Sequence, residues 1–519
     1  MQRMELGDYI KILESSNRIW FFKKNHTEEK LFALSKIGEY GIPSSIYYLI
    51  PFLNDNNKEI QQTTCNVIIH LFKIIVTKKG YYGIFKNCNI SKSDLNFYQC
   101  TFTPEQCVVL YAIATFNGNG HVREEAIKLQ VNTYNGMAIS FIIYRFADWV
   151  PEIRQVALQA LESFKKKKIL NSLVENLSIF ERLPGVQRTD LSAVYSDVMR
   201  FVYVENKQYV SDNFKTFIYS ARIAIAKYLI SSAHIDFEEL KLLVCDKHFI
   251  VRFLALSHFE KFSQTEIELL LKDKSPKIRY KTIFNLKSRA DFQDVIYPFI
   301  FDSSATIRDF ARFSLKNKII DFAAIYNNNL ISKANVLVSL NGLAETNGKR
   351  FVENVADCLT GNVLKIRKAA FLTLEKLDKN KAYNFALENL DSEHLGMRNC
   401  IVNFFSVAPN QDVLQKAREI YFNGKYEKKK SMLKLFSKIG KWTTIADIMI
   451  GTIDEDENIR NYSLGLIQRW RNKATSYFTK PMLNELERAN QVFRLAYEIH
   501  EEKKYFLQNP LIGIDFYLR

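Results

Sequence analysis

Apolar residues recur along this 519-residue chain with the spacing of amphipathic helices, and the helices come in pairs separated by short polar turns. In residues 266–287, for example, a mostly apolar stretch at 267–271 precedes a polar turn that ends at Pro276, and Ile278 and Ile283 then continue on the helical spacing. Pro276 falls in the first turn of the second helix, where a missing N–H costs nothing. The pattern predicts a helical hairpin, repeated along most of the chain.

A short phrase marks the second helix of many pairs: an aspartate in the turn, five intervening residues and an arginine, usually with Ile or Val before it. The full phrase pairs Asp148 with Arg154, Asp246 with Arg252, Asp273 with Arg279, Asp302 with Arg308, and Asp454 with Arg460. Looser copies place an arginine at Arg123, Arg367 and Arg398. Neighbouring arginines are about 30 residues apart, and a fixed period of that length indicates stacked repeats.

The aspartate and the arginine of the phrase have a structural use. The aspartate can accept hydrogen bonds from the free N–H groups of the helix that follows, and it favours the positive end of the helix dipole. The arginine can reach a turn aspartate of its own repeat or of a neighbouring repeat. We therefore predict a ladder of charge-assisted bonds made by these ten residues. A stripe of phosphate-binding arginines is the alternative, but it would not explain the paired aspartates.

The Asp-x5-Arg phrase, the period of about 30 residues and the proline at the start of the second helix (Pro151 and Pro276) resemble HEAT repeats, specifically the short bacterial kind. The resemblance covers nearly the whole chain. It implies an all-α, right-handed α-solenoid of about 13–15 helical hairpins, with the second helices lining the concave side. It implies no catalytic residue and no cofactor, since HEAT arrays mostly serve as scaffolds and binding surfaces.

The repeat pattern breaks in two places. Residues 77–102 carry six aromatic residues among Gly, Asn and Ser and show no helical periodicity, and residues 181–214 hold a helix of their own around 191–204. A long helix is expected at 480–504. The predicted domains are N-terminal repeats and a cap (1–76), an irregular aromatic loop insertion (77–102), HEAT repeats (103–180), an irregular insertion (181–214), HEAT repeats (215–472), and a capping helix with a tail (473–519).

The formal net charge of +16 raises the possibility of nucleic-acid binding. The excess is spread evenly, however, and the only basic runs, at 165–168 and 428–430, lie near the ends of second helices, where lysine is favoured. Residues directly after each arginine should point into the concave groove. These positions hold Glu124, Gln155, Phe253, Tyr280, Asp309, Lys368, Asn399 and Asn461. Such a mixed set argues against a continuous track for a phosphate backbone.

Aromatic residues supply the candidate partner-binding sites. Phe253, Tyr280, Phe284 and Phe313 fall on successive second helices and predict an apolar patch that anchors a partner, with burial between helices as the alternative. The second candidate is the aromatic loop, through Tyr81, Tyr82, Phe97 and Tyr98. Disordered loops are poor in aromatic residues, so we expect this loop to be ordered. A degenerate repeat is the alternative interpretation of residues 77–102.

Residues with catalytic or metal-binding chemistry are sparse. Cys245, His248 and His258 lie close in sequence, but their spacing matches no zinc pattern and a fourth ligand is missing. No phosphate-binding Gly-rich loop or nucleophile elbow is present. Some HEAT-like arrays excise alkylated bases from DNA, and Asp148 and Trp149 are an acid and an aromatic residue of the required types. Asp148 is already explained as a turn aspartate, and no small-molecule substrate is evident.

Seven cysteines without a Cys-x-x-Cys pair predict reduced thiols and a cytoplasmic setting. No apolar run approaches the length of a membrane span, and the first residues lack the pattern of a signal peptide. The leading hypothesis is a non-enzymatic scaffold that holds another protein by its concave surface and its inserted loop; an acidic partner would suit the charge. Nucleic-acid binding is the second hypothesis, and a base-excision glycosylase is the third.

Overall fold

The computed structural model describes residues 6–15, 18–19, 22–23, 26–77, 82–133, 135–166, 169–231 and 235–518. These residues are mostly helical, and their one strand pairing joins β1 (Arg18–Ile19) to β2 (Phe22–Lys23) in antiparallel fashion. The chain divides into two compact units, Met1–Asn285 and Leu286–Arg519. The predicted all-α fold class is confirmed.

The α-helices of the first unit are α1 (Leu6–Glu14), α2 (Thr27–Tyr40), α3 (Ile46–Leu49), α4 (Lys58–Thr77), α5 (Lys92–Thr101), α6 (Pro104–Ala114), α7 (Gly120–Thr133), α8 (Ala138–Ile143), α9 (Pro151–Phe164), α10 (Leu170–Glu175), α11 (Leu177–Phe180), α12 (Ser192–Arg200), α13 (Lys207–Asn213), α14 (Tyr219–Ser231), α15 (Phe237–Val244), α16 (Phe249–Ala255), α17 (Gln264–Leu271) and α18 (Pro276–Asn285). Those of the second unit are α19 (Phe292–Ile296), α20 (Ala305–Ser314), α21 (Phe322–Ile331), α22 (Val336–Glu345), α23 (Val352–Asp357), α24 (Leu364–Leu377), α25 (Lys379–Glu388), α26 (Leu395–Val407), α27 (Gln411–Asn423), α28 (Tyr426–Ile439), α29 (Ile445–Gly451), α30 (Glu457–Ala474) and α31 (Leu483–Lys503). Shorter helical turns are η1 (Pro43–Ser45), η2 (Ile50–Asn54), η3 (Tyr82–Asn87), η5 (Leu183–Gly185), η6 (Phe201–Glu205, a π-helix), η7 (Phe214–Thr216), η8 (Leu256–Lys261), η9 (Tyr297–Phe301), η10 (Lys349–Phe351) and η11 (Asp515–Leu518).

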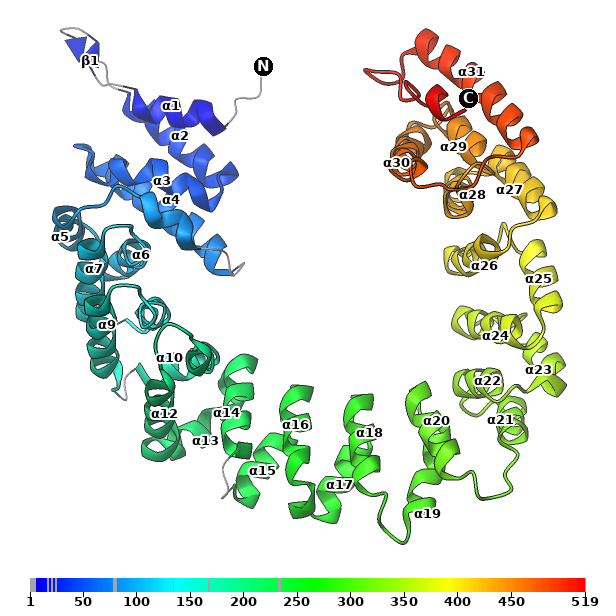
Figure 1. Ribbon diagram of the computed structural model, residues 1–519, viewed down its shortest axis with the longest axis horizontal. Coiled ribbons are helices and arrows are strands. Elements are labelled where there is room, and N and C mark those ends of the chain that lie inside the picture. Colours follow the sequence, from blue (N-terminus) through cyan, green and yellow to red (C-terminus); the bar gives the residue numbers. More distant parts are fainter. Residues whose placement is uncertain are drawn as a thin grey trace. The chain divides into compact units, whose positions relative to one another are not determined.

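Consecutive helices pair into hairpins, and the hairpins stack within each unit (Figure 1). In the first unit α15 packs on α16 and α17 on α18, while α14, α16 and α18 form a continuous layer of second helices. In the second unit α22, α24, α26, α28 and α30 form the corresponding layer, with α21, α23, α25, α27 and α29 packed against it. Each unit is therefore a HEAT-like stack of two helix layers, as an α-solenoid requires.

The first helices of several hairpins begin with a side-chain cap. The Asp236 carboxylate accepts the Glu239 N–H at 2.8 Å, and the Glu239 carboxylate accepts the Asp236 N–H in return at 3.0 Å. Asp321 and Asn410 accept the N–H groups of Ala324 and Val413 in the same way, each at 3.0 Å. Each bond satisfies an N–H group that has no partner inside the helix. These caps fix where the three helices α15, α21 and α27 start.

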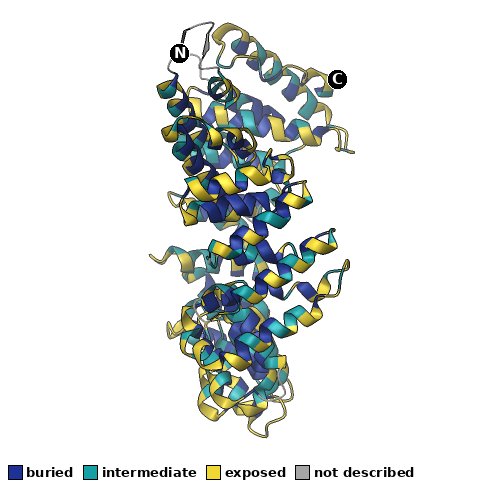
Figure 2. Ribbon diagram, turned by 90° about the vertical axis from the view of Figure 1, so that its left-hand side faces the viewer, coloured by how far each residue is buried: buried dark blue, intermediate teal, exposed yellow. Residues whose placement is uncertain are grey.

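The hydrophobic core of each unit is formed by apolar residues from both helix layers. Many helices therefore have one buried and one exposed side (Figure 2). Several second helices bury the residue four positions after the arginine of the phrase, as the periodicity predicts. Ile127, Ile283, Phe371 and Val402 at this position are fully buried. The opposite side of each second helix is left for solvent or a partner, and it is the side on which the candidate site lies.

Residues 77–102 are not an irregular loop throughout, and this prediction is corrected. The part that the structure describes contains η3 and α5, and α5 starts at a capping box made by Ser91 and Asp94. Leu95 and Tyr98 of α5 are buried in the core of the first unit. The helix has only ten residues, so its periodicity is too short to separate from the surrounding polar residues. The Ser-x-x-Asp spacing was the signal that could have revealed it.

In the second break, the helix expected at 191–204 is present as α12, which continues directly into the π-helix η6. At the other end of the chain, the long helix expected at 480–504 is confirmed as α31. All seven cysteines are unpaired. Within the described part of the chain, no helix has both the length and the apolar character needed to span a membrane.

The helix α31 packs against α29, where the imidazole of His500 is buried. Its Nε2 lies 2.9 Å from the Thr452 hydroxyl oxygen. That hydroxyl donates to the Met449 carbonyl at 2.7 Å, so Nε2 must be the donor. The buried Nδ1 has no partner among the described residues. Burial lowers the pKa of His500, and the positive charge of Arg460 lowers it further.

Acid is therefore expected to destabilise the second unit through His500. Because the pKa is depressed in the folded state, the contribution is fully present above the ordinary histidine pKa of about 6.5 and is lost as pH falls through the folded-state pKa. In His500→Gln the side chain keeps a donor for Thr452 but does not titrate. Urea unfolding at pH 7 and pH 5 should show a smaller loss of stability for this variant. Equal losses would show that His500 does not carry the effect.

Candidate partner-binding site

The arginines of the phrase bind the turn that precedes their own helix. Each donates from Nη1 to the carbonyl oxygen of the residue six positions earlier. These bonds join Arg154 to Asp148 (2.7 Å), Arg252 to Asp246 (2.7 Å), Arg279 to Asp273 (2.6 Å), Arg308 to Asp302 (2.7 Å), Arg398 to Ser392 (2.7 Å) and Arg460 to Asp454 (2.8 Å). Gln61, which occupies the arginine position of an early repeat, donates in the same way to Asp55 at 2.6 Å. The turn is thus locked onto its own helix.

Carboxylate partners come from the next repeat of the stack. Arg123 donates to both oxygens of Asp148 at 3.1 and 3.0 Å, and Arg252 donates to both oxygens of Asp273 at 2.6 and 2.9 Å. Arg222, which occupies the arginine position one repeat before Arg252, donates to Asp246 at 2.7 Å. Bidentate arginine–carboxylate bonds of this kind fix the orientation of both groups. They hold each turn beside the turn of the following repeat.

The turn aspartates do not cap the second helix itself, which corrects one expectation. Each accepts the N–H group two residues further on, which belongs to the residue just before the helix. The acceptors and donors are Asp148 and Val150 (3.1 Å), Asp246 and His248 (2.6 Å), Asp273 and Ser275 (2.7 Å), Asp302 and Ser304 (2.7 Å), and Asp454 and Asp456 (3.0 Å). This is the geometry of an Asx turn, which lets one carboxylate shape the turn and still face an arginine.

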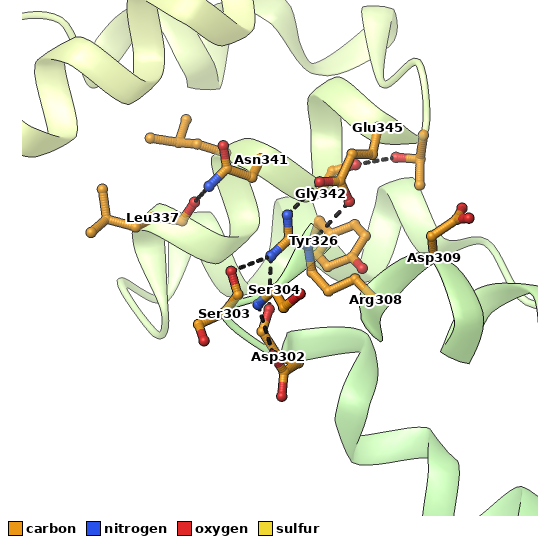
Figure 3. Close-up of polar contacts among 12 residues, drawn as sticks. Asp302, Ser303, Ser304, Arg308, Asp309, Tyr326, Leu337, Asn341, Gly342 and Glu345 are labelled. Carbon is orange, nitrogen blue, oxygen red and sulfur yellow. Dashed lines mark hydrogen bonds and ion pairs between the residues drawn. The ribbon is translucent and has the colours of Figure 1, made fainter. Parts of the chain in front are cut away.

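In the second unit the arginines have other partners (Figure 3). Arg308 lies between the carbonyl groups of its own turn and the carboxylate of Glu345, and its Nε donates to Glu345 at 3.1 Å. At Asp454 the cation is Lys429, whose ammonium group lies 2.8 Å from the carboxylate. Sequence reasoning missed both Glu345 and Lys429 because neither belongs to the Asp-x5-Arg phrase. In these two places the cation–carboxylate contact is kept although the aspartate (Glu345) or the arginine (Lys429) is a different residue.

These contacts decide two of the alternatives. The ladder arginines direct their donors at carbonyls and carboxylates of the protein, so they do not form an exposed stripe for phosphate groups. Asp148 is buried and receives hydrogen bonds from Arg123, from Arg145 at 3.0 Å and from the Val150 N–H. A carboxylate held in this way does not face a substrate, which removes the feature that suggested base excision. Trp149 beside it is 68% exposed.

An aromatic cluster lies on α16 and α18, two of the second helices of the first unit. Phe253 on α16 is 42% exposed and Phe284 on α18 is 46% exposed, whereas Tyr280 is half-buried. The rings of Tyr280 and Phe284 stack, with centroids 6.4 Å apart and an interplanar angle of 23°. The Lys281 ammonium group lies 5.5 Å from the Phe284 ring centre. Two of the predicted aromatic residues are therefore available at the surface, and a cation accompanies them.

A hollow of about 540 Å³ lies beside this cluster. Its apolar wall includes Phe253, Leu256 and Phe259, and its polar residues include Glu260 and Lys281. Pockets that anchor a partner are typically apolar with a few polar groups at defined positions. The hollow lies wholly within the first unit, between α16, η8 and α18. It has the size and lining to receive one or two side chains of a partner.

Phe313, the fourth predicted aromatic residue, belongs to the second unit. It is exposed on α20, and the Lys316 ammonium group lies 4.5 Å from its ring centre. The combination of an exposed phenylalanine with a lysine over its ring therefore occurs in both units. A cation over an aromatic face stabilises the ring's exposed position and leaves a positive charge beside it.

The aromatic loop contributes less surface than predicted. Tyr81 lies outside the described residues. Tyr82 is half-buried and stacks on Phe116 at a centroid distance of 4.8 Å; burial raises its pKa. Tyr98 is buried in the core and is corrected as a partner-binding residue, because a buried ring cannot contact a partner. Phe97 is the one of the three described residues that stays exposed.

The basic runs are mostly occupied within the protein. Lys165 contacts Glu162 at 2.7 Å and also Asp197. Lys428 contacts Glu393 at 2.7 Å, Lys429 contacts Asp454, and Lys430 donates to the Tyr426 hydroxyl at 3.0 Å. Lys167 and Lys168 lie outside the described residues. Neither run is a free cluster of positive charge over its described part.

Histidine and cysteine side chains near residue 245 serve other purposes than metal binding. The His248 Nδ1 accepts the Ile250 N–H at 3.3 Å, and the His258 Nε2 lies 3.1 Å from the Ile230 carbonyl oxygen. In the described ranges, no three His, Cys, Asp or Glu side chains are grouped so that they could hold a metal ion.

Comparison with known proteins adds a likeness between helical structures. No protein-family model matches the chain, and no curated relative matches its sequence. A crystal structure of Kap121p is similar with 11% identity over 98% of this chain and 67% of that chain, at a TM-score of 0.38. Kap121p bound to the extreme C-terminus of the protein phosphatase Cdc14p matches with 10% identity over 99% and 64%, at a TM-score of 0.41. Kap121p bound to Ste12p matches with 11% identity over 98% and 67%, at a TM-score of 0.40.

Proposed function

We propose that this chain is a non-enzymatic scaffold that binds another protein through the second-helix face of its first unit. The observation that supports this most directly is the placement of Phe253 and Phe284, which are exposed beside the 540 Å³ hollow. Large aromatic side chains in and around a pocket are typical anchors of protein interfaces. The proposal includes a cytoplasmic setting, which is supported by the seven unpaired cysteines.

The chemistry of the partner follows from the charges around the aromatic cluster. Lys281 lies over the Phe284 ring and also lines the hollow, where Glu260 is the acidic residue. A partner side chain that enters the hollow must be apolar, and a carboxylate next to it would be placed to meet Lys281. Phe97 on α5, which lines a separate hollow of about 510 Å³, is the remaining candidate from the aromatic segment.

Replacing Phe253 and Phe284 together by alanine is expected to weaken capture of the native partner at least tenfold, since each removes an exposed aromatic anchor. The measurement is affinity purification from native lysate, with nuclease treatment throughout, followed by quantification of the proteins retained by each form of the full chain. Both residues lie at the surface and outside the buried core, so circular dichroism should show unchanged helix content.

Phe422→Ala is the matched control, because Phe422 is an exposed phenylalanine on α27, outside the proposed surface. It should retain the partner at the wild-type level. The proposal fails if the Phe253→Ala/Phe284→Ala form retains the same proteins in the same amounts. It also fails if nuclease alone releases everything that the wild-type chain captures.

A further inference from the structure

Three successive turns of the first unit lie side by side, at residues 215–219, 246–249 and 273–277, and we call them the turn edge. The ladder holds them together. Arg222 donates to the Phe217 carbonyl of its own turn and to the carboxylate of Asp246 in the next turn. Arg252 donates to the Asp246 carbonyl and to the carboxylate of Asp273 in the turn after that. The turn edge is thus a continuous, braced surface at the N-terminal ends of α14, α16 and α18.

A row of aromatic rings lies on this edge. The Tyr219 and His248 rings are stacked with centroids 5.2 Å apart and an interplanar angle of 14°. The His248 and Phe249 rings follow at 5.4 Å and 25°. The hydrogen bond from the Ile250 N–H to the His248 Nδ1 holds the central ring in place. Tyr219 is 56% exposed and Phe249 is 39% exposed, so the two ends of the row are open to solvent.

Four lysines fall in the same three turns. Lys215, Lys247, Lys274 and Lys277 are exposed, and no carboxylate among the described residues forms an ion pair with any of them. The acidic residues of the same turns, Asp246 and Asp273, are engaged by Arg222 and Arg252. The ladder therefore uses the acids of the edge and leaves its lysines to face the solvent.

We propose that the turn edge binds single-stranded nucleic acid, with bases stacked on Tyr219 and Phe249 and backbone phosphates beside the four lysines. Exposed aromatic rings together with lysine residues form the general platform for single strands, because every unpaired base has a face that can stack. A duplex keeps its bases stacked on one another and would use the lysines alone. An acidic peptide would also use the lysines and leave the rings without a partner. The proposal is independent of the protein-binding function proposed above.

The test measures binding of the full chain to a fluorescently labelled 15-nucleotide single strand of mixed sequence by anisotropy, over a range of salt concentrations. Tyr219→Ala/Phe249→Ala is expected to raise Kd at least about 25-fold, because it removes two stacking rings and each lost stacked base costs about 5- to 100-fold. Lys247→Gln/Lys274→Gln should also raise Kd and should reduce the slope of log K against log salt by about 1.4 in magnitude, since each phosphate contact contributes about 0.7.

Two matched controls separate the edge from general charge. Lys376→Gln/Lys379→Gln removes the same charge from exposed lysines of the second unit, and Phe422→Ala removes an exposed ring elsewhere. Both should bind like the wild type. The proposal is overturned if the single strand does not bind at 0.15 M salt, or if the Tyr219→Ala/Phe249→Ala form binds it unchanged. Equal affinity for the duplex of the same sequence, or for a hexaglutamate peptide, overturns it as well.

Discussion

Replacing Asp148 by alanine is expected to lower the free energy of unfolding by about 3–5 kcal/mol, the range for removing one partner of a buried ion pair. The side chains of Asp148 and Arg123 are 1% and 3% exposed, and Arg145 contacts the same carboxylate at 3.0 Å. Burial already lowers the pKa of Arg145, against the opposing attraction of Asp148. Without Asp148, two guanidinium groups would be left in a poorly hydrated site without their carboxylate.

Asp197→Ala is the control for this prediction. Asp197 also contacts two cations, Lys165 and Arg200, but its side chain is 36% exposed. Solvent screens such a site, and its loss should cost at most about 1 kcal/mol. Urea unfolding followed by circular dichroism gives the two values, and hydrogen exchange in α7 and α9 assigns the loss to the first unit. Equal effects of the two substitutions would contradict the role of burial.

The second large effect is expected at Gly342 on α22, where alanine should destabilise the protein by about 1–3 kcal/mol. A Cβ atom at this position would lie 2.5 to 2.6 Å from three atoms of the Tyr326 ring. The ring is held on its other side, because its hydroxyl donates to the Ile300 carbonyl at 2.7 Å and accepts from Arg312 at 3.0 Å. Figure 3 shows Tyr326 packed close to Gly342. Helix and ring would therefore have to move apart.

Gly465→Ala should have the opposite sign. Gly465 lies inside α30 of the same unit, and a Cβ atom there would meet nothing within 4 Å. Alanine should then stabilise the helix by about 0.5–1 kcal/mol through its higher helix propensity. Both variants can be compared by thermal unfolding. If Gly342→Ala were neutral or stabilising, the contact between α22 and Tyr326 would not be as close as the structure places it.

The sequence could determine the features that depend on neighbouring residues: the turn bonds, the helical hairpins and the buried faces of the helices. The bond from each arginine to the carbonyl six residues earlier spans one turn and the start of one helix, so the Asp-x5-Arg phrase carries it completely. The same holds for the hairpins and for the residues buried four positions after several of the arginines, because helical spacing alone decides which side chains share a face. These features predicted a HEAT-like stack of hairpins.

The partners across repeats depended on the packing of one hairpin against the next. Glu345 contacts Arg308 although the two are 37 residues apart in the sequence. Lys429 contacts Asp454 in the place where other repeats have an arginine. The Asp-x5-Arg phrase includes neither contact. Packing also buried Tyr98 while Phe97 stayed exposed one residue away, because a helix turns successive side chains in different directions.

The row formed by Tyr219, His248 and Phe249 combines residues of two repeats in the same way. The sequence by itself determined the repeat and its local turn chemistry, since both depend on residues within about one helical hairpin. Only the tertiary structure decided which side chains meet between repeats and which remain exposed, because those contacts depend on how adjacent hairpins are rotated and spaced in the stack.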